Sequence, residues 1–94
     1  MIIAACTLTL HLPGVHSLKA KRRILKSLLA RLRNEFNLAV AEVDFQDVWQ
    51  TSAVALVAVG NNGAHLHRSL ERAVAWIEEQ RPDLVIELVE VEYR

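Results

Sequence analysis

Apolar residues recur along the chain with two different periods, and these periods divide it into elements. From Ile2 to Leu12 the even positions are apolar, while Thr7 and Thr9 lie on the other side. A period of two is typical of a strand with one buried face. Pro13-Gly14 then predicts a turn.

The clearest helical period runs from Ser17, the predicted N-cap, to Phe36. The apolar side chains share one side of a helical wheel: Leu18, Ile24, Leu25, Leu28, Leu29, Leu32 and Phe36. The basic side chains form a neighbouring arc: Lys19, Arg22, Arg23, Lys26 and Arg33. Lys21 and Arg31 are expected near opposite borders of the apolar stripe. The segment therefore predicts an amphipathic helix with a basic face.

The rest of the chain predicts two further strands, a second helix and a last strand. The strands are expected at Leu38 to Asp44 and Ser52 to Gly60, joined by a hairpin with its corner near Asp47. The second of these strands is apolar on both sides, which predicts cover on both faces. The turn at residues 60–63 predicts an N-cap for a helix that ends before Pro82. The final strand, residues 84–93, changes phase, which indicates a bulge or an exchange of the covered face.

The element order is βαββαβ. The simplest topology for this order, with right-handed crossovers, is an α+β, ferredoxin-like fold of one domain, residues 1–94. It has a four-stranded antiparallel sheet with both helices on one face. Its other sheet face carries apolar residues such as Ile3, Ala5 and Val57. With 52% hydrophobic residues in 94, the chain is expected to cover that face by forming a homodimer or higher homo-oligomer.

The charge is unevenly distributed, although the formal net charge is zero. Residues 1–34 hold seven cations and no acid, whereas residues 35–94 hold all eleven acids and four arginines. Such asymmetry serves either a site for an anionic partner or electrostatic pairing between subunits, and composition does not separate the two. The basic helical face is itself explained equally well as a solvated surface with lysine and arginine stems lying along it.

Two motifs carry a resemblance to a known family. LPGVHSLKAKR at Leu12 to Arg22 and AEVDFQDVWQ at Ala41 to Gln50 together resemble the YlxP-like family of small bacterial proteins of unknown function. The resemblance implies a ferredoxin-like domain, often dimeric, and a role near ribosomal RNA or translation-associated proteins. It supplies no catalytic residue.

Clustered acids are the best enzyme candidates. Glu42 and Asp44 are expected on one strand face, with Asp47 close by in the hairpin, as an acid–base or hard-metal site would need. Pairing with the basic helix or simple solvation is favoured, because no diagnostic ligand spacing accompanies them. His65 and His67 point in nearly opposite directions on a helix and cannot share a metal.

Other chemistry is weakly indicated. Cys6, the single cysteine, is expected to be a buried small hydrophobe. The turn before the second helix lacks the ending of a nucleotide-binding loop. Trp49 and Trp76 are expected as core or interface anchors rather than base stackers. No metal, cofactor or catalytic residue is assigned, and the N-terminal apolar run is too short to span a membrane, so a cytoplasmic location is expected.

Three functions remain as hypotheses. The favoured one is a non-enzymatic module that binds structured RNA or a ribosome-associated factor through Lys19, Arg22, Arg23, Lys26 and Arg33. The second is a homo-oligomeric regulatory or ligand-binding domain with a site at the subunit interface. The third is a hydrolase that uses the acids.

Overall fold

A computed structural model describes all residues, 1–94, and contains six regular elements. They are β1 (Ile2–His11), α1 (Leu18–Glu35), β2 (Ala39–Asp44), β3 (Thr51–Gly60), α2 (Gly63–Gln80) and β4 (Val85–Tyr93). The order βαββαβ is confirmed.

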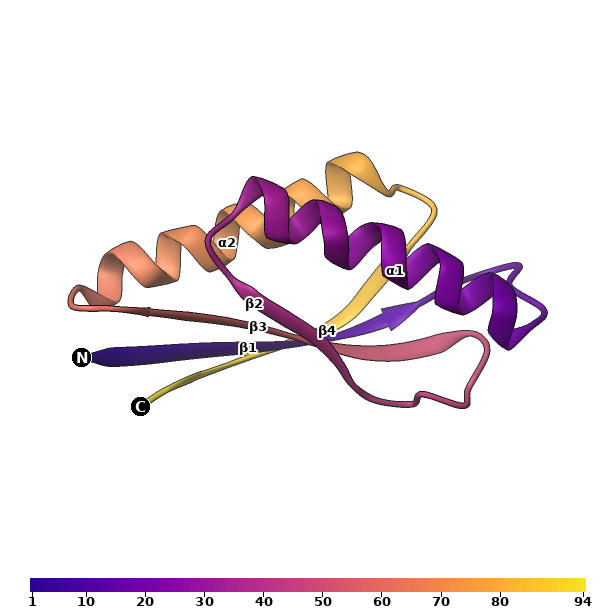
Figure 1. The fold of residues 1–94 in the computed structure, drawn as a ribbon, viewed down its shortest axis with the longest axis horizontal. Helices are drawn as coiled ribbons and strands as arrows, with labels where there is room; N and C mark the ends of the chain where they lie inside the picture. The colour runs from indigo at the N-terminus through magenta and orange to yellow at the C-terminus, as the bar shows by residue number, and fades with distance from the viewer.

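The four strands form one antiparallel sheet in the order β2-β3-β1-β4. β1 and β3 pair along their full lengths, from Ile2 opposite Gly60 to His11 opposite Thr51. Both helices lie on the same face of this sheet (Figure 1). This is the predicted ferredoxin-like arrangement, and it leaves β2 and β4 as edge strands.

Side-chain caps fix where the helices begin. The Ser17 hydroxyl accepts a hydrogen bond from the Ala20 amide at 3.0 Å, and the Asn62 side chain accepts one from the His65 amide at 3.1 Å. Each bond satisfies one amide that the first helical turn leaves without a backbone partner. The apolar stripes of the helices then pack on the even-numbered side chains of β1, which are almost wholly buried.

The phase change in the last strand is a β-bulge. Thr9 lies opposite Leu88 and Leu10 lies opposite Ile86, so Glu87 is the additional residue on β4. Because the bulge shifts the register by one residue, the side of Ile86 is continued by Val89 and Val91 rather than by Leu88. The predicted bulge is confirmed.

The sheet face opposite the helices is open in the single chain. On this face Ala5 lies opposite Val57, and Val57 lies opposite Ala39. At the end of β3, Val59 is 63% exposed. The expected cover on both faces of β3 is therefore supplied mainly on the helix side, although Ala53 on the other side is buried. No helix is long and apolar enough to cross a membrane.

Candidate functional site

Four cations of α1 form one exposed basic face. Lys19, Arg22, Arg23 and Lys26 are all exposed, and their spacing of three, four and seven residues places them on one side of the helix. A single carboxylate approaches them: Asp47 Oδ1 lies 3.9 Å from Arg22 Nη2. Both side chains of that pair are largely solvated, at 66% and 89% exposure, so the attraction is weak. The basic face is almost uncompensated.

The remaining arginines of α1 are engaged within the fold. Arg33 Nη2 donates to the Val40 carbonyl at 2.9 Å, which ties the end of α1 to β2. Arg31 donates to Gln80 of α2 at 2.9 Å, and its guanidinium lies over the Trp76 ring. Arg33, predicted as part of the binding face, therefore also has a structural contact. The positive charge available to an anionic partner therefore lies mainly on the four cations nearer the start of α1.

Lys21 is fully buried, which corrects its expected position at the border of the apolar stripe. It precedes Leu25 by four residues and Leu28 by seven, the spacing of a core position. Its Nζ lies 3.0 Å from Glu42 Oε2 and donates to the Phe45 carbonyl. Ser52, also fully buried, donates to the same Glu42 oxygen at 2.6 Å. This polar network joins α1 to β2, β3 and the β2–β3 loop.

The three acids proposed as an enzyme cluster are separated. Glu42 lies opposite Val54, but a register shift brings Asp44 opposite Ala53, so the two side chains do not share a face. The prediction of a common face is wrong because the bulge falls between them. Asp44 instead accepts from the Phe45 amide at 2.7 Å, and Asp47 is solvated. No group of three or more histidine, cysteine or acidic side chains could hold a metal.

The β2–β3 loop, residues 45–50, displays apolar side chains. Phe45, Val48 and Trp49 are 39%, 44% and 50% exposed. Trp49 is thus not in the core. Trp76, in contrast, packs against the core and makes an edge-to-face contact with Phe36. Phe45 has a φ of +61°, a left-handed conformation that costs a residue with a bulky side chain about 1–2 kcal/mol. The network around its carbonyl holds it there.

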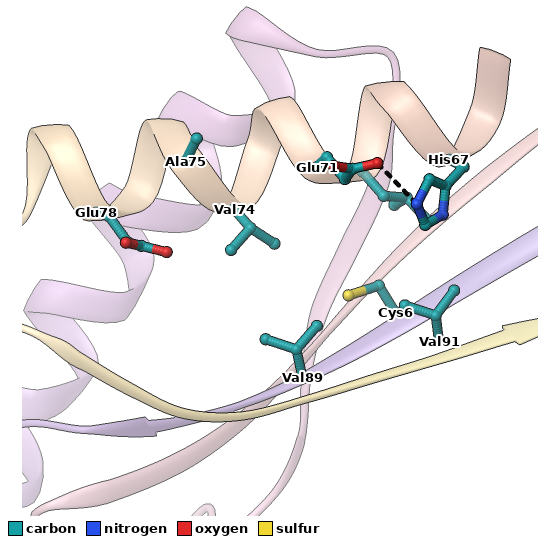
Figure 2. Close-up of a pocket in the computed structure, with 9 residues that line it drawn as sticks. Cys6, His67, Glu71, Val74, Ala75, Glu78, Val89 and Val91 are labelled. Carbon is teal, nitrogen blue, oxygen red and sulfur yellow. Dashed lines mark ion pairs between the residues drawn. The ribbon is translucent and has the colours of Figure 1, made fainter. Parts of the chain in front are cut away.

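A separate cavity of about 250 Å³ lies between α2 and the edge strand β4. Figure 2 shows Cys6 pointing into it from β1, with Val89 and Val91 on one side and His67 and Glu71 on the other. His67 Nε2 lies 2.7 Å from Glu71, and its Nδ1 is 2.6 Å from the Tyr93 hydroxyl. Burial raises the pKa of the Cys6 thiol, so the thiol stays protonated near neutral pH and is a poor nucleophile.

Two features near the basic face were not predicted from the sequence, the burial of Lys21 and the exposure of the loop aromatic residues. The burial of Lys21 has a signal, because its spacing from Leu25 and Leu28 is that of the core stripe. The exposure of Phe45 and Trp49 has none, since aromatic residues in a short loop are equally compatible with burial. Only the three-dimensional arrangement shows that the loop lies against the basic helix.

Comparison with known proteins agrees with the resemblance of the motifs. The chain is 37% identical over 62 residues to "Uncharacterized protein YlxP" of Bacillus subtilis (strain 168), a match that covers 66% of this chain and 67% of the relative. The structure is similar to the "De novo designed protein Foldit4", with a TM-score of 0.54 and 17% identity, over 100% of this chain and 97% of that one. The second likeness concerns the fold alone. The family described as "Protein of unknown function (DUF503)" matches residues 3–92, and the chain belongs to that family.

Proposed function

We propose that this protein is a non-enzymatic module that binds structured RNA through the basic face of α1, formed by Lys19, Arg22, Arg23 and Lys26. The observation that carries the proposal is that all four side chains are exposed on one side of α1 and that a single, solvated carboxylate approaches them. An RNA backbone supplies closely spaced negative charges that such a face would neutralise.

The position of these cations supports an external anion. They occupy the first half of α1, and the first turn of that helix contains no acid. A cation in the first turn, such as Lys19, opposes the helix dipole at a cost of about 0.3–1 kcal/mol, and this cost decreases along the helix toward Lys26. A phosphate backbone would remove this repulsion, whereas the folded chain does not.

The test is binding to an RNA hairpin over a series of salt concentrations, measured by fluorescence anisotropy. The variant R22Q/R23Q/K26Q should fold normally and lose affinity, and its slope of log affinity against log salt should shrink by up to about three. The matched control is R68Q/R72Q/R94Q, which removes the same charge from the acidic part of the chain. The control should keep the slope of the unaltered protein.

Two results would reject the proposal. One is an unaltered protein that does not bind RNA at low salt. The other is equal loss in the two triple variants, because the effect would then follow net charge rather than the α1 face. Retention of a protein partner in place of RNA would assign the face to a ribosome-associated factor.

A second candidate is a homo-oligomeric regulatory or ligand-binding domain with a site at the subunit interface. It is supported by the apolar open face of the sheet and by the cavity that opens beside the free edge strand β4. In this alternative the uneven charge aligns subunits instead of binding RNA.

A further inference from the structure

The exposed apolar loop and the basic face of α1 lie at the same end of the molecule (Figure 1) and meet at Arg22 and Asp47. Lys21, whose neighbour in α1 is Arg22, donates from Nζ to the Phe45 carbonyl at the start of the loop. Arg22 Nη2 lies 3.9 Å from Asp47 in the middle of the loop. The loop lies below the first half of α1, at the same end of the molecule (Figure 1). The loop that carries the exposed aromatic residues therefore adjoins the basic face at Arg22.

Hydrogen bonds hold both ends of the loop. At its start the Phe45 carbonyl accepts from Lys21 and also from the Val48 amide at 3.0 Å. At its end the Gln50 carbonyl accepts from the Leu12 amide at 2.9 Å, and the Gln50 side chain donates to the Val15 carbonyl at 3.0 Å. The backbone on either side of Trp49 is thus held by hydrogen bonds, and the residue is half exposed, which lowers the entropy cost of ordering the loop on binding.

We propose that Trp49, together with Phe45, stacks on unpaired bases of an RNA whose phosphates contact the basic face of α1. This inference rests on the proposed function and specifies its ligand as RNA with an unpaired segment next to a helix. Single-stranded RNA is recognised by aromatic planes beside cations, because bases stack on the rings while the backbone follows the charge. The β2–β3 loop and α1 supply these two components side by side.

Two features favour RNA over other occupants. An apolar protein segment would not use the four neighbouring cations, which lack acidic partners apart from Asp47. A membrane surface would use both the cations and the apolar loop, but Phe45, Val48 and Trp49 are only 39–50% exposed. Partly exposed rings suit stacking on one face better than insertion among acyl chains, where binding strength grows with the apolar area buried.

The experiment compares two RNA probes and three variants. The probes are a hairpin with an unpaired loop and a blunt duplex of the same stem. W49A should bind the hairpin about 5- to 100-fold more weakly, as expected for the loss of one stacked base, with an unchanged salt slope. W49F should retain most of the affinity because it keeps a ring. V48A is the matched control, since Val48 is similarly exposed, at 44% against 50% for Trp49, and has no ring.

A second readout is tryptophan fluorescence. The hairpin should quench the fluorescence of the unaltered protein, and the quenching should be absent in W49F, which retains only Trp76. Equal hairpin affinity of W49A and the unaltered protein would overturn the stacking proposal while leaving the basic face intact, provided that R22Q/R23Q/K26Q still loses affinity. Failure of the unaltered protein to bind either probe would instead reject the proposed function itself.

Two further outcomes would also overturn the inference. Binding to vesicles of anionic phospholipid that depends on Trp49, without binding to the hairpin, would assign the loop to a membrane surface. A change in oligomeric mass in W49A would assign it to an interface between copies of the chain.

Discussion

At the scale of single residues, Lys21 is the one charged residue that is fully buried, and Ser52 is the only other polar one. Its charge is balanced by Glu42, and its position is fixed by Glu42 and the Phe45 carbonyl. Removing one partner of a buried pair leaves the other without compensation, which costs more than the pair contributes. Lys21 therefore acts on the stability of the fold and on the position of the β2–β3 loop, whereas its neighbours in α1 face the solvent.

Replacement of Lys21 by alanine should lower the free energy of unfolding by about 3–5 kcal/mol, because Glu42 and the Phe45 carbonyl lose their partner. Urea denaturation measures this change. K26A is the control on the exposed side of the same helix and should change stability by less than about 0.5 kcal/mol. The variant K21M/E42Q should recover much of the loss, since neither charge is left alone. Equal effects of K21A and K26A would show that the buried pair is not structural.

Cys6 should react slowly with thiol reagents in the folded protein. Burial raises the pKa of its thiol, so at a given pH less thiolate is present than in the unfolded chain. The reaction with an aromatic disulfide reagent should accelerate strongly in denaturant, and folded stability should fall as the pH rises through the ordinary thiol range toward the raised pKa. C6A, which removes the titrating group, provides the control. Rapid modification at neutral pH without denaturant would contradict the buried state.

At the scale of elements, α1 combines two opposing demands. Its apolar stripe packs on the sheet, and Ser17 caps its first turn, both of which stabilise the helix. Its first turn nevertheless carries Lys19 and no acid, although the dipole favours acids there. The first turn of α1 is therefore not optimised for helix stability, and the proposed RNA ligand would supply the anion that this turn lacks.

Replacement of Lys19 by glutamate should therefore change stability and binding in opposite directions. An acid in the first turn should raise the free energy of unfolding by about 1 kcal/mol, while RNA affinity falls because a phosphate contact becomes repulsive. K26E lies near the middle of α1, where the dipole effect is small, and should lose affinity without the gain in stability. Thermal unfolding and anisotropy measure the two quantities. A loss of stability in K19E would contradict this account.

The elements that the sequence predicts well are those with a sustained period. α1, α2 and β1 are confirmed because burial on one face imposes a period of 3.6 or two over many residues. The relation of Glu42 to Asp44 is mispredicted because one irregular residue in a strand exchanges the faces, and nothing local marks it. The proximity of the β2–β3 loop to α1 depends on long-range packing, which periodicity does not describe.

At the scale of the whole molecule, the basic face of α1 and the open face of the sheet lie on opposite sides. The four cations of the basic face lie on the first half of α1, in the layer of helices, whereas the opposite surface is the open face of the sheet, where Ala5, Val57 and Ala39 adjoin one another. An association through the sheet would leave the basic face accessible. The proposed RNA surface and an oligomer are therefore compatible, provided that the interface forms through the sheet.

We expect the chain to form a homodimer in which two open sheet faces pack together. Light scattering should then give a mass near twice 10.6 kDa. A twofold interface places the same patch on both subunits, so V57E should dissociate the dimer by burying two unpaired charges. A64E, which adds the same charge on the exposed surface of α2, should remain dimeric. A monomer at high micromolar concentration would exclude the sheet-face dimer, and dissociation by A64E but not by V57E would place the interface on the helices, where it would compete with RNA.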